Sequence, residues 1–126
     1  MSREQKKPGD AFWAGVFDSA LGQEAEKHIA EQQAALSADP GDARPCFHLG
    51  LLYHMQGKTA AAIEMFERAL ALDPEFVLAH QHLGQIYAVQ GDYARARAHA
   101  REAAARGHAA LLEMLDRYAP AAPPRH

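Results

Sequence analysis

The chain has little of what disulfide-bonded, zinc-binding or membrane proteins require. It holds one cysteine, Cys46, and no apolar run that approaches the roughly 20 residues of a membrane-spanning helix. A single cysteine excludes an internal disulfide and any zinc motif built from several cysteines of this chain. Residues 1–7 are polar, and no apolar signal core follows them. We therefore expect a cytoplasmic protein without a membrane segment.

An excess of positive charge is also missing. Lysine and arginine number 13 against 16 aspartates and glutamates, for a formal net charge of −3. Nucleic-acid binding needs clustered positive charge, so we expect no nucleic-acid partner. Four arginines do fall in one expected helix, at positions 95, 97, 101 and 106, and we interpret them as a solvated face. The preference for alanine and for arginine over lysine suggests a GC-rich bacterial source, an association without a physical argument.

Catalytic motifs are absent as well. Gly57-Lys58-Thr59 matches only the end of a phosphate-binding loop, without its upstream glycine or its strand. Ser19 and Ser37 have no evident base partner, and Cys46 occupies a packing position that does not suit a reactive thiolate. We expect no enzyme activity, no catalytic residue and no cofactor.

What the chain does have is an internal repeat with an offset of 34 residues. The segment 43–76 recurs as the segment 77–110, which is the signature of stacked supersecondary units. A repeat of this kind favours a function in surface binding over a function in catalysis. Its matched positions are Leu49-Gly50 with Leu83-Gly84, Tyr53 with Tyr87, Gly57 with Gly91, Ala60 with Ala94, Ala62 with Ala96, and Ala69 with Ala103.

Turn residues divide the repeat into helix, tight turn and helix. Gly57 and Gly91 suit the end of one helix, and Asp73-Pro74 suits the start of the next, with Asp73 as cap and Pro74 in the first turn. Asp39-Pro40 lies 34 residues before Asp73-Pro74 and extends the period backwards. The expected helices are Asp10–Leu21, Gln23–Ala38, Ala43–Gln56, Thr59–Leu72, Pro74–Gln90, Asp92–Arg106 and His108–Tyr118.

The chain resembles the tetratricopeptide repeat (TPR) family. The second repeat carries the family pattern in Leu49-Gly50, Tyr53, Ala62, Phe66, Ala69 and Pro74, with Cys46 in place of a tryptophan. The third keeps His80, Leu83-Gly84, Tyr87, Ala96 and Ala103 but loses the Phe and Pro positions. The first keeps Phe12, Ala35 and Pro40 but has Gly15, Val16 and Ser19 where Leu-Gly and Tyr belong.

The resemblance implies an all-α fold, a right-handed α-solenoid of about three TPR-like helix-turn-helix repeats plus a C-terminal capping helix. We expect a flexible tail over residues 1–9, a TPR domain over 10–118 and a flexible Pro-rich tail over 119–126. Within the domain we expect a degenerate repeat at 9–42, repeats at 43–76 and 77–110, and the capping helix at 108–118.

The resemblance also implies a concave groove lined by the first helix of each repeat. The family's carboxylate clamp needs several cations, but Arg44 is the one fixed cation at these positions. We expect a non-catalytic adaptor whose groove binds an apolar or amphipathic peptide or helix of a protein partner. The expected groove residues are Trp13, Phe17, Arg44, Phe47, His48, Leu51, His54, Gln81, His82 and Gln85.

Three alternatives remain open at this stage. Trp13, Phe17 and Phe47 can pack on one another instead of on a partner. The N-terminal aromatic helix can bury against a second copy and form a homodimer or a larger assembly. His48, His54 and His82 can face one groove and bind a metal or small ligand, but they include no i,i+4 pair and no suitably placed carboxylate. We expect no metal site.

Overall fold

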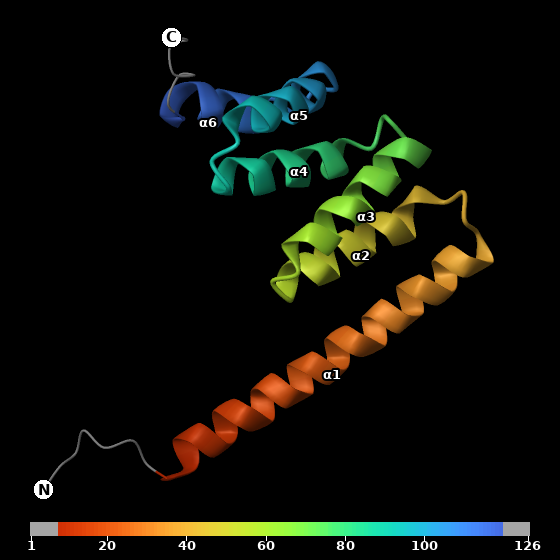
Figure 1. Ribbon diagram of the computed structural model, residues 1–126, viewed down its shortest axis with the longest axis vertical. Coiled ribbons are helices and arrows are strands. Elements are labelled where there is room, and N and C mark those ends of the chain that lie inside the picture. The colour runs from red at the N-terminus through yellow and green to blue at the C-terminus, as the bar shows by residue number, and fades with distance from the viewer. Residues whose placement is uncertain (1–7, 120–126) are drawn as a thin grey trace, which may run out of the picture.

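The computed structural model describes the backbone of residues 8–119 and the side chains of residues 22–119, and this part of the chain is helical without strands. The tails expected at residues 1–9 and 119–126 lie largely outside the described residues, and α1 already begins at Pro8. In chain order (Figure 1) the helices are α1 Pro8–Ala38, α2 Ala43–Met55, α3 Thr59–Leu72, α4 Val77–Val89, α5 Tyr93–Ala105 and α6 Ala110–Tyr118.

The helices stack as an all-α, right-handed solenoid built on two helical hairpins. α2 packs on α3, α4 packs on α5, and α3 packs on α4, so that each hairpin lies against the next (Figure 1). α6 packs on α5 and α4, and its Leu111 and Leu115 are buried there. One core runs through the stack, and its largest fully buried side chains are Phe66, Leu49, Leu83 and Cys46.

Glycine allows close contact between helices at two equivalent positions. A Cβ on Gly50 would lie 2.6 Å from the Phe66 ring of α3, and a Cβ on Gly84 would lie 2.6 Å from the tip of Leu111 of α6 and 3.4 Å from the Ala96 carbonyl oxygen of α5. The turns between paired helices also need glycine, since Gly57 has φ of 77° and Gly91 has φ of 82°. The recurrence of these glycines in both repeats therefore explains why each repeat forms a helical hairpin.

The expected division of the first repeat into two helices is wrong, because α1 is one continuous helix of 31 residues. The residues that make a hairpin are missing there. Thirty-four residues before the turn glycine Gly57 stands Gln23, and 34 before the contact glycine Gly50 stands Val16. His28 likewise stands where the second repeat has the small residue Ala62. The nearest glycine, Gly22, stands one residue before the position equivalent to Gly57, and the helix continues through it.

The expected start of α4 at Pro74 is also wrong, because the helix begins at Val77. Asp73 does not cap α4. Its Oδ1 accepts a hydrogen bond from the Glu75 backbone N–H at 3.0 Å, and its carbonyl accepts one from the Phe76 N–H at 3.1 Å. The Asp-Pro pair thus forms a turn that directs Phe76 onto Phe47, with ring centroids 4.9 Å apart.

Candidate partner-binding groove

Two equivalent stripes of side chains follow α2 and α4 at helical spacing. Each repeat contributes an imidazole to its stripe, and each stripe ends on an apolar residue. Three apolar side chains are left exposed: Met55 by 80%, Leu78 by 47% and Val89 by 89%. All three stand at positions that the family pattern assigns to the groove. The stripes are Arg44, His48, Leu51 and Met55 on α2, and Leu78, His82, Gln85 and Val89 on α4.

Phe47 is a core residue and not a free contact residue of the groove, contrary to expectation. It is 7% exposed, and its ring lies 5.6 Å from Phe66, 4.9 Å from Phe76 and 5.5 Å from His82, centroid to centroid. Phe47 therefore packs within its own chain, on Phe66, Phe76 and His82. The alternative in which it packs on Trp13 and Phe17 involves side chains outside the described residues. Phe47 and Phe66 form an aromatic floor beneath His82 of the α4 stripe.

His82 lies on this floor. Its ring stacks on Phe66 at 5.5 Å with an interplanar angle of 8°. Burial lowers the pKa of His82 below its ordinary value, and nearby His54 lowers it further. His54 and Gln85 are exposed, and Gln81 is half-buried. The neutral imidazole of His82 can donate and accept hydrogen bonds at the groove surface.

Arg44 is held by its own helix cap. Its guanidinium contacts both carboxylate oxygens of Asp42, with the shortest distance 2.8 Å from Nη2 to Oδ2. Asp42 also accepts the Arg44 backbone N–H at 3.0 Å and so caps α2. The hydrogen bonds from Arg44 lower the pKa of Asp42 to about 2. Arg44 is thus already paired with an anion, which weakens it as a clamp for a partner's carboxylate.

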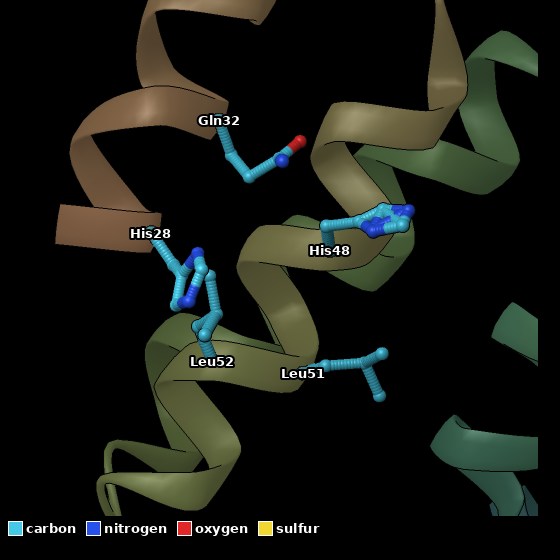
Figure 2. Close-up of a pocket in the computed structure, with 5 residues that line it drawn as sticks. All are labelled: His28, Gln32, His48, Leu51 and Leu52. Atoms are coloured by element: carbon cyan, nitrogen blue, oxygen red, sulfur yellow. The ribbon is translucent and has the colours of Figure 1, made fainter. Parts of the chain in front are cut away.

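A recess lies between α1 and α2. It is a cavity of about 190 Å³, and Figure 2 shows the residues that line it, His28 and Gln32 of α1 and His48, Leu51 and Leu52 of α2. An adjoining cavity of about 410 Å³ shares His28 and Leu52 and continues to Gly22, Glu24, Ala25, Met55 and Gln56. Trp13 and Phe17 lie on α1, in the part whose side chains are outside the described residues.

Sequence reasoning missed a hydrogen-bonded histidine pair between α4 and α5. The Pro74 carbonyl accepts from His80 Nε2 at 3.2 Å, which leaves the His80 Nδ1 lone pair to accept from His99 Nδ1–H at 3.1 Å. One repeat earlier, the equivalent residues are the buried, apolar Cys46 and Met65. The joint replacement of two apolar residues by two histidines was the available signal. Burial raises the pKa of the Cys46 thiol, consistent with an inert packing residue.

The histidines predict that acid destabilises the fold. Burial, then His80, lowers the pKa of His99, while Glu102 opposes this effect and the Tyr87 ring stacks on the other side. Because the pKa values of His82 and His99 are lowered by folding, the unfolded chain binds more protons below about pH 6.5. The stability from the neutral rings is complete above that pH and is lost as pH falls through the lowered values. Urea unfolding at pH 7.5 and 5.5 should give the smaller free energy at pH 5.5.

A matched variant replaces the histidine pair with the residues found at the equivalent positions of the preceding repeat. The double substitution His80→Cys and His99→Met should reduce this pH dependence, whereas His108→Gln, at an exposed position, should keep it. An unchanged pH dependence in the double variant would contradict the role of the pair.

Arg97 of α5 and Arg106 at its C-terminal cap join α5 to neighbouring parts of the stack. Arg106 pairs with Glu75 at 2.7 Å and with Glu102 at 2.8 Å, and the Arg106 guanidinium lowers the pKa of Glu75. Arg97, only 18% exposed at its side chain, lies 3.7 Å from Asp116 of α6. Arg95 pairs with Asp92 at the start of α5. The expected solvated basic face therefore consists largely of ion pairs.

Among the residues that the structure describes, no three His, Cys, Asp or Glu side chains come close enough together to hold a metal ion. Nor does any helix there combine the length and the apolar character needed to cross a bilayer.

Comparison with known proteins identifies the repeat. A family model described as TPR repeat matches residues 50–91, and one described as tetratricopeptide repeat matches residues 81–113. No curated protein sequence matches the chain. Two crystal structures of MamA superpose with TM-scores of 0.63 and 0.60 at 26% identity, covering 78% and 82% of this chain and 54% of each MamA chain.

A third structure, MamA from residue 41 to its end from Desulfovibrio magneticus RS-1, has a TM-score of 0.57 at 25% identity and covers 90% of this chain and 61% of that one. The chain thus spans little more than half the length of these proteins. TPR proteins are generally non-catalytic interaction modules, and these similarities support a role in protein interaction or scaffolding. The chain belongs to the tetratricopeptide repeat family.

Proposed function

We propose that the chain is a non-catalytic adaptor that binds an apolar or amphipathic helix of a partner protein in the groove between α2 and α4. The observation that carries this proposal is the exposure of apolar side chains along the two stripes, above all Leu78 and Val89 on α4. Exposed apolar side chains aligned along one surface are typical of interaction sites.

The geometry favours a helical ligand. Each stripe extends over 12 residues, about 16 Å of helix, which matches about three turns of a partner helix. A helix laid in such a groove presents apolar residues at i, i+3, i+4 and i+7, and these would pack on Leu51, Leu78 and Val89. His48 stands between Arg44 and Leu51 in its stripe, and His82 stands between Leu78 and Gln85. Their imidazoles can hydrogen-bond to polar groups at the edge of the ligand.

The scarcity of free charges along the two stripes favours a partner segment with an uncharged contact face. Asp42 already holds Arg44, and the remaining stripe positions are imidazole, amide or apolar. A strongly charged ligand would find no free counter-ion along the α4 stripe. The partner segment should therefore carry apolar residues toward the groove and keep its charges toward solvent.

Affinity capture with matched variants tests the proposal. Leu78→Asp and Val89→Asp change exposed side chains and should leave the helical circular dichroism unchanged, but each should reduce recovery of the groove partner from native extract at least tenfold. Met114→Asp is the control, since Met114 is 56% exposed on α6, away from the groove. A protein recovered equally with all three variants does not bind this groove. If no protein depends on Leu78 and Val89, the proposal is wrong.

A further inference from the structure

The cavity between α1 and α2 occupies the position of a missing helix. In the formed repeats, α2 lies beside α3, and α3 packs on α4. One period earlier, the second half of α1 corresponds to α3, and α2 corresponds to α4. The helix that would correspond to α2 is residues 10–21, which instead continue straight along α1. The cavity is where that helix would pack.

The repeat identifies which residue the cavity lacks. Phe47 of α2 lies against Phe66, at 5.6 Å, and against His82, at 5.5 Å. The equivalents of these three residues one period earlier are Trp13, Gln32 and His48. Gln32 and His48 both line the cavity of about 190 Å³ shown in Figure 2. Trp13 is therefore the residue that the period assigns to this cavity.

The chain's own Trp13 does not reach it. Trp13 and Gln32 lie on one continuous helix, 19 residues apart, which separates them by about 28 Å along the axis. α1 runs antiparallel to α2, since Gln33 donates to Tyr53 Oη at 3.3 Å and Gln56 donates to Glu26 Oε1 at 3.0 Å. In this register α2 ends near Gly22 of α1, and the first half of α1 extends beyond the hairpin (Figure 1).

Folding back within one chain is opposed by the residues present. A hairpin in the register of the other repeats would need positive φ at Gln23, one residue after Gly22, and it would need Val16 to approach the second half of α1 as closely as Gly50 approaches Phe66. Neither constraint applies to a helix from another molecule, because no short turn then fixes its depth or register. An apolar helix of about 14 residues is also marginal in water without a packing partner.

We propose that the first half of α1 from one molecule occupies the α1–α2 cavity of a second copy, with Trp13 between Gln32 and His48, and that the exchange is reciprocal. The result is a two-fold symmetric dimer in which each chain donates one helix and accepts one. The donated helix would contact His48 and Leu51, which also belong to the α2 stripe of the proposed groove, whereas Leu78 and Val89 on α4 are not among the residues that line the cavity.

Sedimentation equilibrium on the full chain tests the exchange. The wild type should be a concentration-dependent dimer at micromolar concentration. Trp13→Ala removes the donated ring, and Gln32→Trp fills the cavity from within the acceptor chain. Each should raise the dimer dissociation constant at least a hundredfold while circular dichroism stays helical. Leu78→Asp and Met114→Asp should remain dimers, which separates this result from loss of groove binding.

The single tryptophan gives a second readout. Emission of wild-type Trp13 should shift to longer wavelength on dilution, as the ring leaves the partner's cavity. A wild type that is monomeric at all concentrations would overturn the proposal. If the emission of Trp13 in that monomer were typical of a buried ring and did not change on dilution, α1 would instead fold back within its own chain. A dimer whose affinity is unchanged in both Trp13→Ala and Gln32→Trp would also overturn it, because another surface would then hold it.

Discussion

Phe66→Ala should remove about 3–5 kcal/mol of folding stability, the usual cost of truncating a buried phenylalanine. Phe66 is completely buried, packs on Gly50, and stacks on His82 at 5.5 Å. It therefore joins α3 both to its hairpin partner α2 and to the next hairpin. Small domains have only about 5–15 kcal/mol in total, so this loss takes most of the stability. Urea unfolding followed by circular dichroism measures it.

The matched control for Phe66 is Tyr118→Ala. Tyr118 is 74% exposed at the end of α6, and its truncation should change stability by no more than about 0.5 kcal/mol. A similar small change for Phe66→Ala would mean that the two hairpins do not share one core.

Phe47→Glu should unfold the chain. The substitution removes a ring that contacts Phe66, Phe76 and His82 and places a carboxylate where the side chain is 7% exposed. Burial of an unpaired charge costs several kcal/mol beyond the roughly 3–5 kcal/mol of the lost ring, and together these approach the whole stability of a small domain. Loss of the helical circular dichroism signal at 25 °C is the expected observation.

Phe47→Leu distinguishes the effect of losing the aromatic ring from the effect of burying a charge. Leucine keeps an apolar side chain in the same space, so this variant should fold and should lose less stability than Phe47→Glu. A folded Phe47→Glu with normal helical content would contradict the buried position of Phe47. It would return this residue to the exposed groove that the family pattern implies.

The 34-residue period predicted the two formed hairpins because their determinants are local. Gly57 and Gly91 set the turns, and Gly50 and Gly84 allow the close contacts, so the same residue types recur wherever a hairpin forms. The first repeat was predicted wrongly because the apolar pattern continues there while those determinants do not. Gln23 in place of a turn glycine was the visible signal that α1 would run on.

The groove was only partly predictable for a related reason. The period assigns equivalent positions, but it does not say which of them a neighbouring loop will cover. Phe76, in the turn before α4, covers Phe47, whereas Met55 and Val89 at the ends of their helices stay uncovered. The His80–His99 pair depends on a contact between two helices that a single repeat, with Cys46 and Met65, does not display.

Nuclear magnetic resonance with the captured partner segment tests the groove most directly. A synthetic peptide of that segment, titrated into the full chain, should shift the methyl signals of Leu51, Met55, Leu78 and Val89, and the Leu78→Asp variant should abolish these shifts. Met114, which is also exposed but lies on α6, should not shift. Shifts confined to α3, α5 or α6, with the α2 and α4 methyl groups unchanged, would contradict the account.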